Sequence, residues 1–241
     1  EFIGKSKVPI MNSAGGTEVS GSILHCCLHR PFKVGSFNAP IPGMSADILT
    51  LDGKKVSTDE MGELVMRKSS IGLTKSLWND DGRYIKNYWS IIKDFWVHGD
   101  LASKDKDGHW FLHGRSDDTI KVSGKRIGPS ELESVIVKSG KAKEVAAVGI
   151  PDENKGSKII LSIVLLENSE EKESYFENLV INDLGKSFKP DKIIFVKDLP
   201  KTRNMKIMRR VIKSCLAKED PGDISTLLNP ESVEEIRAHA I

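Results

Sequence analysis

Apolar and polar residues alternate along the first half of the chain with the two-residue period of β-strands. The segments with this pattern are Ala46 to Leu51 and Gly62 to Arg67, and Val8 to Met11 is predicted to be a short, wholly apolar strand. Two further apolar segments flank Asp105-Lys106-Asp107-Gly108, whose glycine can take the positive φ of a hairpin turn. Residues 33–116 are therefore predicted to form a small β-rich unit of half-buried antiparallel strands.

From Asp118 onward the pattern changes to strands that alternate with helices. Pro129-Ser130-Glu131 places a proline and an acidic residue where a helix begins. The other predicted strands are Thr119 to Val122, Glu144 to Ile150, Ile159 to Leu166 and Lys192 to Val196, and the predicted helices are Leu132 to Val137, Glu170 to Leu184, Ile207 to Ala217 and Pro230 to Ala240. The fold class is predicted to be α+β, with a second unit of about a hundred residues that has its own core.

The composition is that of an ordinary globular protein, with 29% charged and 39% apolar residues. A formal net charge of +2 gives no global field that would favour nucleic acid or an anionic membrane. No apolar run approaches the ~18 residues of a membrane-spanning helix. The opening Glu1-Phe2-Ile3-Gly4 has no signal-peptide pattern and no initiator methionine, so we expect a cytoplasmic protein of which this is one piece.

Three cysteines do not make a disulfide framework. His25-Cys26-Cys27-Leu28-His29 does bring four possible metal ligands together, but vicinal cysteines point apart and no second pair follows at zinc-finger spacing. The alternative to a metal site is that this segment is a partly buried structural segment, and we favour that interpretation.

Two short segments could carry chemistry. Gly15-Gly16 precedes Thr17-Glu18, and a glycine turn, a hydroxyl and a carboxylate suit a phosphate with its Mg²⁺. Ser123-Gly124 follows the polar joint that separates the two units. Taken alone, Thr17 is better explained as a helix-capping residue, and Ser123-Gly124 fits an ordinary tight turn equally well.

Three motifs, in order along the chain, resemble those of the adenylate-forming superfamily, in its AMP-forming acyl-CoA synthetase branch for acetyl or short- to medium-chain acids. They are Gly15 to Glu18, then Gly99-Asp100 with Asp105 to Gly108 and Gly114 to Ile127, and last Leu199 to Ile207. The resemblance implies that residues 1–116 end a large N-terminal domain with a nucleotide motif and a distorted β-barrel. Residues 117–241 would then be a small mobile α+β domain that pivots at Asp117.

The resemblance also implies a set of roles for individual residues. An acyl-CoA ligase uses ATP and Mg²⁺ to convert a carboxylic acid to an acyl adenylate, and then transfers the acyl group to coenzyme A. The residues implied are Thr17, Asp100, Arg115 and Arg126 for the nucleotide, Glu18 for Mg²⁺, Lys206 for catalysis, Asp117 for the hinge, and Ser123 and Gly124 for coenzyme A.

The chain departs from the family pattern at several positions. Met205 stands where glycine usually precedes the catalytic lysine, and His98 stands where Thr or Ser is common. Gly15 occupies the place of a tryptophan found in acetate-specific relatives, which favours a larger substrate. The family's glycine-rich phosphate loop is not in this sequence, so the chain is expected to need a missing N-terminal part for activity.

Two other functions remain open at this stage. An enzyme of the same superfamily could load a carrier-protein thiol in place of coenzyme A. A non-enzymatic module could instead grip nucleic acid with the basic segment Lys201 to Lys218, although such a run is usually a solvated helix face. The aromatic residues of the first unit could stack on a nucleotide base, although packing of the barrel side is the commoner use; they are Trp78, Tyr84, Tyr88, Trp89 and Trp96.

Overall fold

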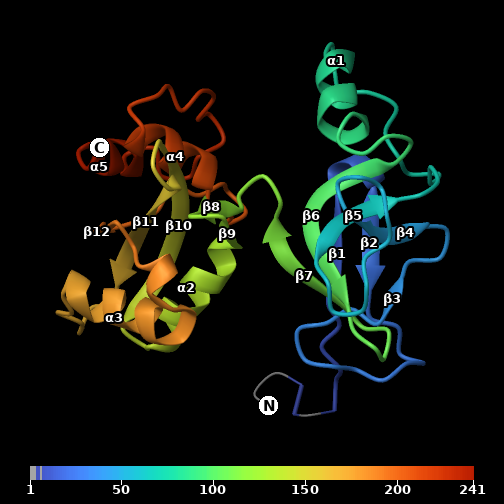
Figure 1. The fold of residues 1–241 in the computed structure, drawn as a ribbon, viewed down its shortest axis with the longest axis horizontal. Helices are drawn as coiled ribbons and strands as arrows, with labels where there is room; N and C mark the ends of the chain where they lie inside the picture. Colours follow the sequence, from blue (N-terminus) through green and yellow to red (C-terminus); the bar gives the residue numbers. More distant parts are fainter. Residues whose placement is uncertain (1–3, 6) are drawn as a thin grey trace. The chain divides into compact units, whose positions relative to one another are not determined.

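The computed structural model describes residues 4–5 and 7–241, and the chain divides into two compact units, Glu1–Asp117 and Asp118–Ile241. The first three residues, on which the expectation of a longer chain partly rests, lie outside the described residues. The predicted α+β class is confirmed, because both units combine sheets with a few helices (Figure 1).

The first unit contains two antiparallel sheets. One has the order β1-β2-β3 and the other β4-β5-β6-β7. The strands are β1 Ser13–Gly16, β2 Gly21–His25, β3 Ala39–Pro40, β4 Ala46–Leu49, β5 Gly62–Met66, β6 Trp96–Lys104 and β7 Trp110–Arg115, and the short helices are η1 Thr17–Val19, α1 Asp81–Tyr84 and η2 Ile85–Trp89. Phe37 joins the sheets, because its backbone exchanges two 2.8 Å hydrogen bonds with Trp110 at the start of β7.

Both sheets of the first unit contribute side chains to one core, in which Trp96 is the largest fully buried residue. Tyr88 stacks on Trp96 with ring centroids 5.2 Å apart, and Tyr84 packs against Tyr88. These three aromatics therefore support the wall of the unit, whereas Trp78 is 92% exposed and takes no part in that packing. Sheets that share a core and are bridged at Phe37 make a barrel-like unit.

Two local predictions for the first unit are wrong. Val8 to Met11 is not a strand, and the strand lies at Ser13–Gly16, where a loop and a glycine turn were expected. Close strand contact explains this, because a Cβ at Gly15 would lie 2.0 Å from the carbonyl oxygen of Gly21 in β2. Glycine at this position serves the pairing of two strands rather than a turn.

Strand β5 is buried along its whole length, although an alternating pattern was expected. It lies between β4 and β6, and both of its faces are covered. Leu64 and Met66 face the main core, whereas Val65 packs in a second cluster with Leu49, Ile92 and Val97. A strand with a core on each side reads as a continuous apolar run.

The hairpin of β6 and β7 forms as predicted. The carboxylate of Asp105 accepts hydrogen bonds from the backbone N–H groups of Asp107 and His109, and Gly108 has φ +87°. Lys33 adds a 2.6 Å ion pair to the same carboxylate. The turn therefore depends on an ionised Asp105.

The second unit is built on a three-stranded sheet with the order β10-β11-β12, in which the first pair is antiparallel and the second parallel. Its strands are β10 Ala142–Asp152, β11 Gly156–Leu165 and β12 Lys192–Phe195, with a separate hairpin of β8 Ile120–Val122 and β9 Lys125–Ile127. Its helices are α2 Pro129–Lys138, α3 Glu173–Leu184, η3 Lys186–Phe188, α4 Arg209–Leu216 and α5 Ser232–Arg237. The sequence pattern missed β9, and α5 is shorter than predicted.

Each face of this sheet has its own core. Alternate residues of β10 point to opposite sides, so that Val145 belongs to one cluster and Ala146 to the other. The first cluster includes α2, α3 and the β8–β9 hairpin, and the second includes α4 and α5. The two faces are thus covered by different parts of the sequence.

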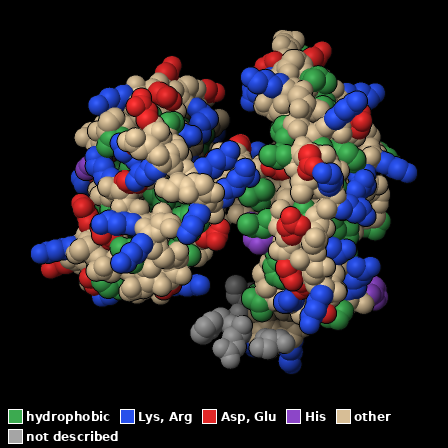
Figure 2. Space-filling view, in the orientation of Figure 1, with side chains coloured by type: hydrophobic (Ala, Val, Ile, Leu, Met, Phe, Trp, Pro, Cys, Tyr) green, Lys and Arg blue, Asp and Glu red, His purple; other side chains and the backbone are tan. Residues whose placement is uncertain are grey.

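Charged side chains of both signs are mixed on the face of each unit drawn in Figure 2. This agrees with the formal net charge of +2. Among the described residues, no helix is both long enough and apolar enough to cross a membrane.

We predict that Asp105→Asn weakens the first unit at neutral pH and that the difference disappears in acid. The hydrogen bond from Lys33, with those from the turn backbone, holds the pKa of Asp105 at about 2, below its ordinary value of 3.8. The folded state therefore binds fewer protons, and the carboxylate's stabilisation is present above about pH 4 and is lost as the pH falls towards 2. Unfolding midpoints of wild type and variant at several pH values measure the effect. A difference that is the same at pH 6 and pH 2 would contradict it.

Candidate functional site

The ends of β6 and β7 bring the predicted site residues of the first unit together. Strand register sets Asp100 opposite Arg115, and the guanidinium Nη1 lies 3.6 Å from the Asp100 carboxylate. The same guanidinium donates to Asp117 over 3.0 Å through Nε and to the backbone carbonyl of His98 over 3.0 Å. Arg115 therefore links the predicted ribose-binding acid to the predicted hinge residue.

Gly99 allows this arrangement. Its φ of +83° lies in the left-handed region, and a Cβ there would lie 2.7 Å from the Arg115 guanidinium. The glycine before Asp100 therefore leaves room for the arginine and permits the backbone conformation.

His98 is a member of this site that the sequence marked only as a departure from the family pattern. Its ring is buried, its centroid lies 5.5 Å from that of Trp96, and Nε2 is 3.3 Å from the Asp100 carboxylate. Burial lowers the pKa of His98, and the nearby Asp100 carboxylate only partly offsets this. The neutral imidazole is therefore favoured, and it stands between Trp96 and Asp100.

Glu18 joins the same cluster from η1. Burial raises the pKa of Tyr88, and the negative charge of the nearby Glu18 carboxylate raises it further. A Cβ at Gly16 would come within 3.2 Å of both Glu18 and His98. Thr17 is exposed beside Glu18. The predicted phosphate and Mg²⁺ residues thus lie near the Asp100 and Arg115 pair within one unit.

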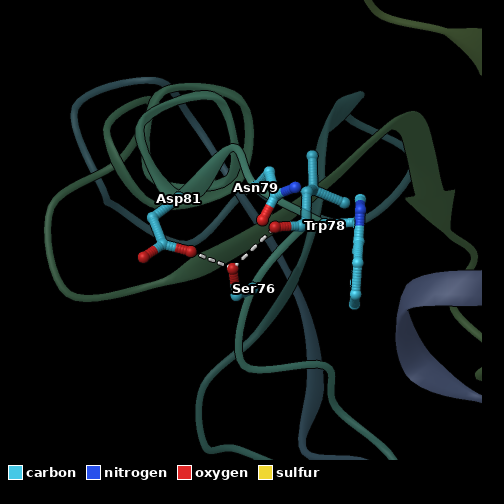
Figure 3. A pocket seen from close by; sticks show the side chains of 5 residues that line it. Ser76, Trp78, Asn79 and Asp81 are labelled. Carbon is cyan, nitrogen blue, oxygen red and sulfur yellow. Dashed lines mark hydrogen bonds between the residues drawn. The ribbon is translucent and has the colours of Figure 1, made fainter.

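A pocket of about 270 Å³ opens at this cluster, and Tyr88, His98, Arg115 and Asp117 are among the residues that line it. Another pocket of the first unit, beside α1, contains none of the predicted site residues (Figure 3). In it the Ser76 hydroxyl hydrogen-bonds to Asp81 and to the Leu77 carbonyl. The pocket at Arg115 is therefore the one that we assign to the candidate site.

Glu63 is a site residue that sequence reasoning missed. It lies in β5 with its side chain buried, and its Oε2 has no hydrogen-bond partner among the described residues. Burial raises the pKa of Glu63, and the Ser116 hydroxyl and the Arg115 charge only partly counter this. The available signal was an acidic residue inside an otherwise apolar strand.

In the second unit, Ser123-Gly124 forms the turn of the β8–β9 hairpin, with φ of +49° and +81°. The Ser123 N–H donates to the Lys155 carbonyl over 2.8 Å, and nothing lies within 4 Å of a Cβ placed on Gly124. Arg126 follows on β9 and is exposed. The Gly124 edge is open within this unit.

Lys206 lies on a narrow loop that returns on itself. Lys201 and Ile207 form a β-bridge, and the Thr202 N–H donates to the Lys206 carbonyl over 2.9 Å. Met205 takes a left-handed φ of +61°, a conformation that costs a side chain about 1–2 kcal/mol. The Lys206 side chain is exposed.

The second unit does not bring Lys206 and Gly124 together. The β8–β9 hairpin packs in the core with α2 and α3, whereas Ile207 and Met208 pack in the core with α4 and α5. These cores lie on opposite faces of the β10-β11-β12 sheet. The two residues are therefore carried by elements on opposite sides of the sheet.

The His25 to Cys27 part of the His25 to His29 segment packs against the fold, whereas Leu28 and His29 are exposed. Cys26 is buried and its Sγ donates to the Ser36 carbonyl over 3.4 Å, while the Cys27 N–H donates to Asn38. In the described part of the chain no three His, Cys, Asp or Glu side chains are close enough to hold a metal ion by themselves.

Comparison with known proteins places these features in a family context. Residues 131–206 match the model of the AMP-binding enzyme C-terminal domain. The acetyl-coenzyme A synthetase of Methanothrix thermoacetophila is 39% identical over 97% of this chain and 37% of its own length. That of Pasteurella multocida is 38% identical over 98% of this chain and 38% of its own length.

Solved structures share the fold. The acetoacetyl-CoA synthetase from Streptomyces lividans matches with a TM-score of 0.83 and 22% identity, over 95% of this chain and 35% of that one. An anthranilate CoA ligase in complex with anthranoyl-AMP matches with a TM-score of 0.72 and 27% identity, over 86% of this chain and 40% of that one. The chain spans little more than a third of the curated relatives that it matches.

We predict that Gly99→Ala destabilises the first unit by about 1–2 kcal/mol, because alanine is strained at positive φ and its methyl group displaces Arg115. Gly82→Ala is the control, since Gly82 lies in α1 with open space around it, and it should stabilise by about 0.5–1 kcal/mol. Urea unfolding of both variants provides the comparison. Equal effects of the two substitutions would rule out the conformational argument.

We predict that Met205→Gly stabilises the second unit by up to about 1 kcal/mol. Glycine relieves the left-handed strain, and its greater freedom in the unfolded chain offsets part of the gain. Asn204→Gly, at the neighbouring position without a positive φ, should destabilise. Thermal unfolding distinguishes the two, and a loss of stability in both variants would show that Met205 is not strained.

Proposed function

We propose that the protein is an AMP-forming acyl-CoA ligase, because residues 131–206 match the model of the AMP-binding enzyme C-terminal domain. It activates a carboxylic acid with ATP and then transfers the acyl group to coenzyme A. The observation that supports this most is the separation of Lys206 and Gly124 onto elements from opposite faces of one sheet. One small domain can then present a different face in each half-reaction.

In the first half-reaction a carboxylate attacks the α-phosphate of ATP and pyrophosphate leaves. Both reactants are anions, so the site must neutralise phosphate charge and align the attack. Asp100 accepts hydrogen bonds from the ribose hydroxyls, and Arg115 supplies positive charge beside it. Thr17, a residue of the first unit, binds phosphate, and Arg126, a residue of the second unit, adds a positive charge.

Glu18 is the residue that would hold Mg²⁺. Protein-bound Mg²⁺ commonly uses one or two carboxylates together with substrate phosphates and water. A single carboxylate next to the exposed Thr17 fits this pattern. The ion would supply charge neutralisation to the phosphates.

Lys206 is the catalytic residue of this step. Its exposed ammonium group, on a loop held by backbone hydrogen bonds, can reach the charge that develops on the reacting phosphate. One oriented donor at such a position is worth about 3 kcal/mol of barrier.

The second half-reaction is attack of the coenzyme A thiol on the acyl adenylate. Gly124 offers an open backbone edge along which the narrow thiol arm passes, and Ser123 lines the same passage. Asp117 is the hinge about which the small domain turns between the two steps. It ends the first unit and holds Arg115 through two hydrogen bonds.

The acid is proposed to be larger than acetate. The support for this is that Gly15 stands where acetate-specific relatives have tryptophan. We also propose that the remaining N-terminal part of the protein supplies the carboxylate pocket and the phosphate loop. A cytoplasmic location is proposed as well, in keeping with the free cysteines.

The ion pairs of the second unit argue against the alternative of a basic module that binds nucleic acid. Lys201 is buried against Glu144 and Asp198, and Arg209 is bound to Glu133 by two hydrogen bonds. These cations are therefore engaged within the second unit. Loading of a carrier-protein thiol is tested by an assay with free coenzyme A.

We predict that Lys206→Ala in the full-length protein lowers ATP–pyrophosphate exchange by about a hundredfold or more. Gly124→Leu should leave exchange intact and abolish thioester formation. Lys213→Ala, on the exposed face of α4, and Gly140→Leu, which shares the positive φ and open space of Gly124, are the matched controls. Loss of both half-reactions in Gly124→Leu, or failure of the wild type to make an acyl-CoA, would overturn the proposal.

A further inference from the structure

Lys201 lies five residues before Lys206 and has a different environment. Its side chain is buried, and its ammonium group lies 2.8 Å from Glu144 of β10 and 2.6 Å from Asp198. Burial alone would lower the pKa of Lys201, but the hydrogen bonds to Asp198 and Glu144 outweigh it and the pKa is raised. Lys201 is thus a buried, charged anchor for the start of the Lys206 loop.

Asn229, in the C-terminal tail, holds the same segment from another direction. Its Oδ1 accepts a 3.0 Å hydrogen bond from the Lys201 N–H. Its Nδ2 donates to the Asp198 carboxylate over 2.7 Å and to the Leu199 carbonyl over 2.8 Å. The amide of this one buried side chain therefore has both its oxygen and its nitrogen engaged with the base of the loop.

The tail backbone extends this contact. The Leu228 N–H donates to the Lys201 carbonyl over 2.8 Å, and Leu227 forms a β-bridge with Thr202. Thr202 in turn donates to the Lys206 carbonyl. A continuous path of hydrogen bonds therefore runs from the tail to the backbone of Lys206.

The tail is itself fixed in the core. Leu227, Val233 and Ile236 pack in the same cluster as Leu199, and the Ser232 hydroxyl donates to the Asn229 carbonyl over 2.7 Å. A rigid support of this kind can hold a catalytic group within the small tolerance that reaction requires.

From these contacts we infer that Asn229 is a positioning residue for Lys206 in adenylation. The tail segment 227–229 clamps the base of the loop and so sets where the lysine points. This inference rests on the proposed function. Asn229 lies beyond residue 206, where the match to the family model ends.

The clamp should act on one half-reaction only. Its residues lie on the face of the sheet that α4 and α5 cover, whereas the hairpin with Gly124 packs on the other face. Loss of Asn229 should therefore disturb the Lys206 loop and leave the Gly124 edge in place.

The test uses the full-length protein with Asn229→Asp and Asn229→Ala. Asn229→Asp keeps the acceptor for Lys201 but sets a carboxylate against Asp198. A misplacement of about 1 Å can cost a hundredfold in rate, so both variants should lose ATP–pyrophosphate exchange by about ten- to a hundredfold. Thioester formation from supplied acyl adenylate should stay within about twofold of wild type. Arg237→Ala, which removes an exposed ion pair of the same tail, should change neither rate.

Amide hydrogen exchange gives a readout that does not require activity. In both Asn229 variants the amides of Thr202 and Met205 should lose protection, while the Ser123 amide should not. Equal loss of both half-reactions, unchanged adenylation, or unchanged protection at Thr202 and Met205 would each overturn the inference. If the wild type forms no acyl adenylate but Thr202 and Met205 are deprotected in the variants, the proposed function fails and the clamp stands.

Discussion

The register of the β6–β7 hairpin is the constraint on which the candidate nucleotide site depends. It sets Asp100 opposite Arg115, and the guanidinium then reaches the His98 carbonyl and Asp117 as well. A shift of one residue would turn both side chains to the other face of the strands. The Asp105 turn and the left-handed Gly99 maintain that register and make room for the arginine.

In the proposed function, the second unit has a different requirement, which is to present two chemically different edges. A sheet with a core on each face does this, because its alternate side chains support separate layers. The hairpin with Gly124 belongs to one layer, and the loop with Lys206 adjoins the other. In the proposed enzyme, a turn about Asp117 would exchange one edge for the other without refolding either.

Much of this architecture could be predicted where a local signal agreed with the fold. The hairpin turn at Asp105, the proline-led start of α2 and the apolar run of β11 are examples. Prediction failed where tertiary contact decided. Gly15 lies in a strand where β2 is too close for a side chain, whereas Val8 to Met11 is not a strand. Glu63, His98 and Lys201 owe their roles to burial, and Glu63 and Lys201 also to partners distant in sequence, which no local pattern reveals.

The C-terminal tail shows that the segment matched by the family model is shorter than the segment needed for the fold. The family match ends at residue 206, yet α4, Leu227 and α5 complete one of the two cores, and the last amide, of Ile241, donates to Leu216. A shortened version cut at the end of the match would leave one side of the sheet bare and prone to aggregate. Independent folding of this unit therefore requires the longer stretch, and the tail is constrained because it covers one face of the sheet.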